Sequence, residues 1–192
     1  MPITTLDPQT ALIAIDLQNG IASQFAEADA LKHVVENTNR LSEAFRARGW
    51  PVVLVVAAGR APGRTDQPRR GPTTMAPGGR DLVPELIQAE GDIRLSKYTP
   101  GAFAHTGLED KLKALGVTQV VITGVVTSGG VDATARQAYE LGFNVTLPTD
   151  AMRDGGPETH AETISKVFPR IAEVGMTDDV LARMAEGAAP VS

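Results

Sequence analysis

Apolar residues in this chain gather into short runs separated by segments of mixed polarity. The runs Ala11–Leu17, Pro51–Ala58 and Val120–Val125 are almost continuously apolar and rich in β-branched residues. A strand covered on both faces of a sheet has this composition, because neither face is left to water. Three further strands, shorter or more polar, are predicted at Asp92–Lys97, Asn144–Met152 and Ile171–Val174.

Between these runs the apolar residues recur at helical spacing. Leu31–Arg48 carries an apolar stripe and is followed by Gly49, as expected of an amphipathic helix that ends at a glycine. The same reasoning predicts helices at residues 108–115, 131–141, 158–168 and 177–184. Strands alternating with helices predict an α/β protein, a Rossmann-like three-layer α/β/α sandwich with a doubly wound sheet.

Composition narrows the range of functions. A chain of 192 residues fits one domain, 1–192, with a flexible loop at 59–80 and a frayed tail at 186–192. The net charge of -5, with Lys and Arg spread along the chain, argues against nucleic-acid and anionic-membrane partners. The apolar runs are too short to span a bilayer and the start lacks a signal-peptide pattern, so we expect a cytoplasmic protein.

The residue types that could hold a metal are scarce. The chain has no cysteine, which excludes disulfides and Cys-ligated zinc. Its three histidines, His33, His105 and His160, lack the spacing of metal ligands, and we predict neither a metal nor another cofactor. His105, His160 and Glu162 are interpreted as surface residues.

The glycine-rich turn after Val125 is the main candidate for chemistry. Gly124, Gly129 and Gly130 surround it, and a helix follows. Such a turn directs backbone N–H groups and a helix N-terminus towards one point, where they stabilise negative charge. The alternative is a tight turn required only for packing.

Two charged side chains end other predicted strands. Asp16 ends the first predicted strand, and Lys97 ends the third. A carboxylate at the end of a buried strand needs a partner, and the carboxyl ends of parallel strands meet at one edge of a sheet. The alternatives are a capping role for Asp16 and an ordinary rim charge for Lys97.

Four segments of the chain resemble one family. They are GVVTSGGVDATARQA in the turn and its helix, ALIAIDLQNG near the start, SKYTPGAF in the middle, and NVTLPTDAM with HAETI near the end. Together they resemble the isochorismatase-like hydrolases, or cysteine hydrolase superfamily, over about residues 9 to 185. The resemblance implies sheet order 3-2-1-4-5-6, a small-molecule substrate, and self-association as a dimer or tetramer.

The resemblance also implies roles for single residues. Amidase members carry a nucleophilic cysteine where this chain has Gly130, whereas isochorismatases carry glycine and hydrolyse a vinyl ether with an Asp and a Lys. Asp16, Lys97 and Gly130 are therefore the expected catalytic positions, and a cis peptide is expected at Val126-Thr127. The expected substrate-binding residues are Gln18, Phe103, Val126, Thr127, Ser128 and Gly129. Many relatives have Ser where this chain has Gly101.

Several alternatives remain open from the sequence alone. In the first, Ser128 replaces the cysteine as the nucleophile, and the protein would be an amide hydrolase. In another, the fold has lost its nucleophile and binds a small molecule without turnover. The 59–80 loop is rich in arginine, and these side chains could contact an anionic substrate or a neighbouring subunit. The alternative is that the loop is simply solvated. Its arginines are Arg60, Arg64, Arg69, Arg70 and Arg80.

Overall fold

The computed structural model describes residues 3–25, 31–66 and 74–186. All strand pairs of the sheet are parallel, in the order β3-β2-β1-β4-β5-β7, and β6 pairs with β4 beside this path. The predicted order is confirmed, with β7 in the place of the sixth strand and β6 as an addition. The strands are β1 Thr10–Ile15, β2 Val52–Ala57, β3 Ile93–Lys97, β4 Gln119–Val125, β5 Asn144–Pro148, β6 Met152–Arg153 and β7 Glu173–Gly175.

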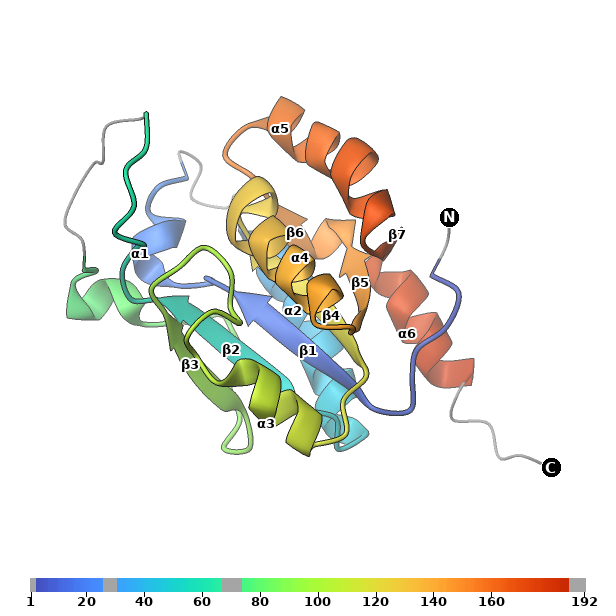
Figure 1. Cartoon of the computed structure of the whole chain (residues 1–192). Coiled ribbons are helices and arrows are strands. Elements are labelled where there is room, and N and C mark those ends of the chain that lie inside the picture. The colour runs from blue at the N-terminus through green and yellow to red at the C-terminus, as the bar shows by residue number, and fades with distance from the viewer. Residues whose placement is uncertain (1–2, 26–30, 67–73, 187–192) are drawn as a thin grey trace.

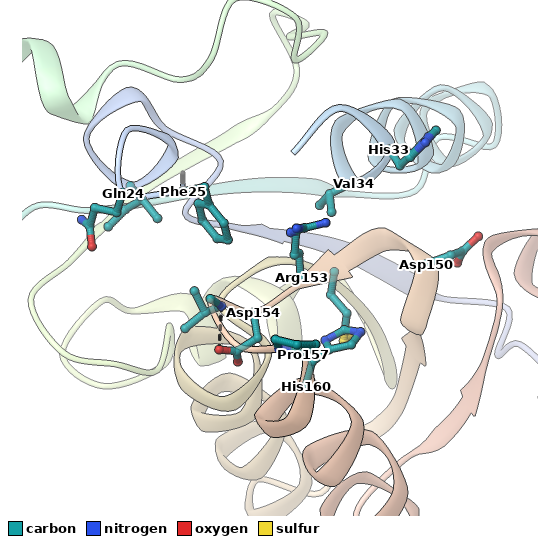
Figure 2. Close-up of a pocket in the computed structure, with 13 residues that line it drawn as sticks. Gln24, Phe25, His33, Val34, Asp150, Arg153, Asp154, Pro157 and His160 are labelled. Carbon is teal, nitrogen blue, oxygen red and sulfur yellow. Dashed lines mark hydrogen bonds between the residues drawn. The ribbon is translucent and has the colours of Figure 1, made fainter. Parts of the chain in front are cut away.

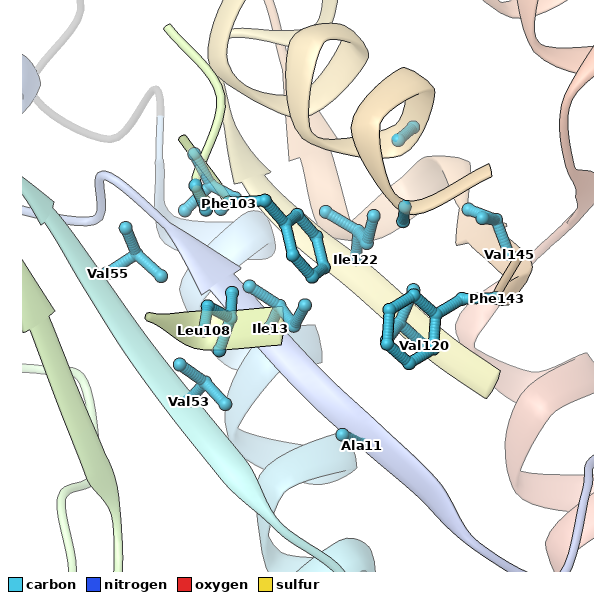
Figure 3. Packing of buried hydrophobic residues seen from close by; sticks show 14 of the residues in the cluster. Ala11, Ile13, Val53, Val55, Phe103, Leu108, Val120, Ile122, Phe143 and Val145 are labelled. Carbon is cyan, nitrogen blue, oxygen red and sulfur yellow. The ribbon is translucent and has the colours of Figure 1, made fainter. Parts of the chain in front are cut away.

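Helices cover both faces of the sheet (Figure 1). They are α1 Asn19–Ala22, α2 Lys32–Ala47, α3 Leu108–Ala114, α4 Asp132–Glu140, α5 Pro157–Glu162 and α6 Thr177–Glu186. Alternate residues of β1 point to opposite faces, with Leu12 packing on the side of α2 and α6 and Ile13 on the side of α3 and α4. Figure 3 shows the second of these clusters, where Ile13, Val53 and Ile122 meet Phe103 and Leu108.

The predicted strand Asn144–Met152 is wrong as a single element. The chain leaves β5 after Pro148, makes a 3₁₀ turn at Thr149–Ala151, and returns as the two-residue strand β6. β6 pairs not with β7 but with the end of β4, Gly124 opposite Met152 and Val125 opposite Arg153. This detour adds residues 152–156 to the edge of the sheet where the glycine-rich turn lies.

The predicted helix at residues 158–168 also changes form along its length. α5 begins at Pro157, widens into a π-helical turn at Thr163–Val167 and tightens into a 3₁₀ turn at Phe168–Arg170. Pro169 lacks the N–H that a continuing α-helix needs. The Phe168 carbonyl accepts the N–H groups of Ile171 and Ala172, so the last strand starts at Glu173, two residues later than predicted.

Part of the 59–80 loop and most of the tail, 187–192, lie outside the described residues, as do Arg69 and Arg70. Gly59 forms an isolated antiparallel bridge with Thr74, and a 3₁₀ turn follows at Pro77–Arg80. Arg80 donates from Nε to the Met75 carbonyl, 3.1 Å away. None of the helices in residues 3–25, 31–66 and 74–186 is both long and apolar enough to span a lipid bilayer.

Candidate functional site

Asp16 and Lys97 form a buried ion pair at the carboxyl edge of the sheet. The Lys97 Nζ lies 2.8 Å from Asp16 Oδ2, and the residues are only 3% and 6% exposed. Lys97 also donates to the carbonyl oxygen of Pro100 at 2.9 Å. The pair joins β1 to the end of β3 across the intervening β2, so the structure brings together the two charged residues that the sequence placed at strand ends.

The Asp16 carboxyl group has unusual surroundings. The residue has a left-handed backbone (φ 55°), which ends β1 and turns its side chain towards Lys97. Oδ1 is buried and makes no hydrogen bond within the described residues. Burial raises the pKa of Asp16 above its ordinary value, and the Lys97 charge opposes this only in part. Asp16 therefore takes up a proton, as a general acid requires, more readily than an exposed aspartate does.

Gly130 lies directly against this carboxyl group. A β-carbon added at Gly130 would lie 3.1 Å from Asp16 Oδ2 and 2.9 Å from Ile15 Cγ2. Gly130 belongs to a π-helical turn, Thr127–Val131, that precedes α4. The three expected catalytic positions are thus contiguous, and a side chain at position 130 would contact Asp16.

The cis peptide of this turn lies one residue earlier than expected. It joins Val125 to Val126, not Val126 to Thr127. β4 ends at Val125, and the Val126 carbonyl already serves the turn by accepting the N–H groups of Gly129 (3.0 Å) and Val131 (3.2 Å). Val126 is therefore the first residue of the turn, and the expected position was wrong by one.

Gln18 is held by the protein at both ends of its amide. Its Nε2 donates to the carbonyl oxygens of Ala57 (3.0 Å) and Gly79 (2.9 Å), and its Oε1 accepts the Ala57 N–H at 2.6 Å. The residue is fully buried. These bonds fasten the end of β1 to the end of β2, while a substrate contact for Gln18 stays a prediction.

Phe103 packs into the core. Its ring lies beside that of Phe143 (Figure 3), with the ring centroids 5.7 Å apart. Its N–H donates to Gln137 Oε1 at 3.0 Å. A β-carbon at Gly101 would lie 2.2 Å from the same Gln137 oxygen, so Gln137 fills the place of a side chain at position 101. A pocket-wall role for Phe103 stays a prediction.

A cavity of about 890 Å³ opens beside the glycine-rich turn (Figure 2). Of the expected site residues, Val126 lines it; Asp16 and Lys97 do not. The residues lining it come from α1 and the segment after it, the start of α2, β6 and the start of α5. They are Ile21, Gln24, Phe25, His33, Val34, Val126, Asp150, Met152, Arg153, Asp154, Gly155, Pro157 and His160.

The polar residues of this cavity were not predicted as site residues. His160, interpreted as a surface residue, is half-buried, and its Nδ1 lies 2.8 Å from Thr127 Oγ1. Asp154 accepts the N–H of Ser128 at 2.7 Å. The glycine pair after Asp154, and the proline that starts α5, are the sequence signal that could have placed these residues at the carboxyl edge. His105 and Glu162 are exposed, as expected.

Hydrogen bonding and burial shift the pKa values of these two groups. Burial opposes ionisation of Asp154, but hydrogen bonds from the Ser128 side chain and backbone and from the Gly155 and Gly156 N–H groups outweigh it and lower the Asp154 pKa. Burial lowers the pKa of His160, against the attraction of the Asp154 charge. His160 is therefore more readily neutral than an exposed histidine.

A metal centre finds no support in the described part of the chain. There, no three His, Asp or Glu side chains converge in a group that could hold an ion. The expectation of a metal-free protein stays a prediction.

Comparison with known proteins gives consistent relatives. Residues 10–179 match the model of the Isochorismatase domain. The uncharacterized isochorismatase family protein YecD of Escherichia coli O157:H7 is 35% identical over 90% of this chain and 94% of its own. The ureidoacrylate amidohydrolase RutB of Klebsiella variicola is 31% identical over 81% of this chain and 78% of its own. The structure of an isochorismatase family protein from Burkholderia thailandensis has a TM-score of 0.89 and 35% identity, covering 96% of this chain and 98% of that one.

Proposed function

Because the chain belongs to the isochorismatase family, we propose that it is a hydrolase that cleaves a small molecule without a cysteine nucleophile. Asp16 is the general acid, Lys97 holds it and balances its charge, and the backbone of Thr127–Gly130 binds an oxygen of the substrate. The observation that carries this proposal is the 2.8 Å contact between Asp16 and Lys97 beside Gly130.

The residues present favour a vinyl ether, such as isochorismate, as the substrate. A vinyl ether is activated when its double bond takes a proton on carbon, which leaves an oxocarbenium ion. Water then adds to that ion, the hemiketal breaks down to an alcohol and a carbonyl compound, and the proton returns to the carboxylate. This route needs an acid and water but no enzyme nucleophile, and it suits a carboxyl group whose pKa burial raises.

Amide hydrolysis through Ser128 is the second candidate, and the name of one relative, an amidohydrolase, supports it. Ser128 is exposed and hydrogen-bonded to Asp154, which gives it a neighbouring carboxylate. The lowered pKa of Asp154 makes that carboxylate a weak base, however. We therefore favour the Asp16 route.

A hydrolase screen with isochorismate, amides and esters tests both routes. We expect turnover of the vinyl ether, a loss of about 100-fold or more in Asp16→Asn and Lys97→Met, and little change in Ser128→Ala. Asn is chosen at position 16 because it tolerates the left-handed backbone there.

Other outcomes of the screen select the alternatives. Amide turnover that is lost in Ser128→Ala would replace the Asp16 route with the serine route. Ligand binding with no turnover of any substrate would make this a family member with a structural ion pair and no catalysis.

A further inference from the structure

The loop that follows β3 carries one of the groups that fix the Lys97 ammonium. Lys97 ends β3, and its Nζ donates to Asp16 at 2.8 Å and to the carbonyl oxygen of Pro100 at 2.9 Å. A lysine has a flexible four-carbon stem, so the position of its ammonium depends on the groups that accept its hydrogen bonds. Pro100 lies in no strand or helix, and its position depends on what holds the loop.

Two side chains of α4 hold the next part of this loop. Thr134 Oγ1 accepts the N–H of Ala102 at 3.1 Å, and Gln137 Oε1 accepts the N–H of Phe103 at 3.0 Å. The two acceptors are three residues apart on α4, so both face the loop, which runs alongside this helix in Figure 1. Because Ala102 is fully buried, its N–H would be left without a partner if Thr134 lost its hydroxyl.

Thr134 also binds the glycine-rich turn. Its hydroxyl donates to the carbonyl oxygen of Gly130 at 2.6 Å, so a single oxygen atom links this turn to the loop after β3. Gly130 lies against the Asp16 carboxyl group, because a β-carbon added there would be 3.1 Å from Oδ2. The contacts thus close a ring that runs from the Asp16–Lys97 ion pair through the loop and Thr134 back to Asp16.

Gly101 makes room for the second of these side chains. The three atoms nearest to a β-carbon added at Gly101 all belong to Gln137, and Oε1 would be only 2.2 Å away. Gly101 does not have a positive φ, so its backbone would accept an alanine. A side chain at position 101 therefore competes with Gln137 for one space.

We propose that Thr134 and Gln137 are positioning residues, which hold the loop after β3 so that the Lys97 ammonium stays on Asp16 beside the glycine-rich turn. Neither lines the cavity beside that turn, and each acts through the backbone groups that it binds. Their effect on turnover rests on the proposed function, whereas their effect on the ion pair does not.

Thr134→Val tests the first residue, because it removes the hydroxyl and keeps the branched shape. We expect kcat to fall about tenfold with little change in KM, since the catalytic groups shift relative to one another. Thr134→Ser keeps the hydroxyl and should restore most of the activity. Thr163→Val is the matched control, and kcat should not change. Thr163 is also buried and donates to a carbonyl four residues earlier, Thr159 at 2.8 Å, but it accepts no N–H from another described segment.

NMR of the Asp16 carboxyl carbon gives a second readout that needs no substrate. The Lys97 charge lowers the pKa of Asp16 against the larger effect of burial, and this influence weakens when the ammonium moves away. The Asp16 pKa should therefore rise in Thr134→Val and stay unchanged in Thr134→Ser and Thr163→Val. A purely structural role of Thr134 would lower thermal stability and leave the Asp16 pKa where it is.

Gln137 is tested through Gly101. Gly101→Ala should lower kcat about tenfold, because its β-carbon displaces the Gln137 amide from the Phe103 N–H. Gln137→Ala already lacks that hydrogen bond, so adding Gly101→Ala to it should cost little more. The losses of the two single variants should thus fail to add in the double variant.

An Asp16 pKa that is unchanged or lower in Thr134→Val would overturn the proposal for Thr134, and additive losses at positions 101 and 137 would overturn it for Gln137. If no substrate is hydrolysed, a raised Asp16 pKa in Thr134→Val still supports the positioning role, and only the proposed function fails. Turnover that is lost in Asp16→Asn but unaffected by Thr134→Val would do the reverse.

Discussion

At the scale of single residues, glycines decide how closely the site is packed. Gly124 lies in β4 opposite Ile15 of β1, with φ 110°, and a β-carbon there would lie 2.1 Å from the Ile15 carbonyl oxygen. That contact is with backbone and cannot be relieved by a rotamer change. Gly124 thus allows the backbones of β1 and β4 to come close together at Ile15, the residue before Asp16.

Gly124→Ala should lower the free energy of unfolding by more than about 3 kcal/mol, because the clash adds to the strain of the backbone. Gly142→Ala is the matched control. Gly142 also has positive φ (86°) but nothing within 4 Å of an added β-carbon, so its cost should be about 1 kcal/mol. Urea denaturation measures both, and equal losses would show that strain rather than the clash determines the effect.

At the scale of elements, two ion pairs tie α2 to its neighbours, one buried and one exposed. Arg46 binds both oxygens of Asp92, just before β3, at 2.9 and 2.8 Å, and the Asp92 side chain is only 2% exposed. Arg40, on the same helix, pairs with Asp178 of α6, but both side chains are largely exposed. Only the first pair loses its water on folding, so it should contribute more.

Arg46→Met should therefore destabilise the protein by about 2–4 kcal/mol, since it leaves the Asp92 carboxylate buried without its cation. Arg40→Met should change stability by less than about 1 kcal/mol. Thermal and urea denaturation of the two variants provide the comparison. A similar small loss in both would mean that Asp92 is solvated after the substitution.

At the scale of the whole molecule, the Asp16–Lys97 pair joins the ends of β1 and β3, strands that are not neighbours in the sheet. Because burial raises the pKa of Asp16 in the folded state, its titration couples the stability of the fold to pH. An acid whose pKa is raised in the folded state keeps a proton that the unfolded chain has released, so stability falls as pH rises from the ordinary value towards the raised one.

Lys97→Met should reveal this dependence. Without the ammonium, the main influence that opposes burial is lost, and the folded-state pKa of Asp16 rises further. The free energy of unfolding of Lys97→Met, relative to Lys97→Met/Asp16→Asn, should decrease from about pH 4 to pH 8, by at most about 1.4 kcal/mol per pH unit. A difference that does not vary with pH would mean that Asp16 is solvated once Lys97 is removed.

Self-association as a dimer or tetramer stays a prediction, which sedimentation would measure.

Much of the fold could be predicted because the signals are local. β-branched apolar runs formed the strands covered on both faces, and β1, β2 and β4 lie within two residues of the predicted bounds. Asp16 and Lys97 could be placed at one edge because each ends a parallel strand. The break between β5 and β6 was missed because the apolar residues Ala151 and Met152 resume directly after Thr149 and Asp150, the two polar residues that begin the turn.

The sequence by itself determined the strand order, through its family resemblance, and the meeting of Asp16, Lys97 and Gly130, because parallel topology brings these strand ends together. The tertiary structure alone decided that His160 meets Thr127, that Arg153 and Phe25 share a cavity, and that Gln18 serves the backbone. These contacts join segments far apart in the chain, and they depend on the detour through β6 and on how α5 packs. No local period or spacing carries that information, since it arises only when the elements fill the space between one another.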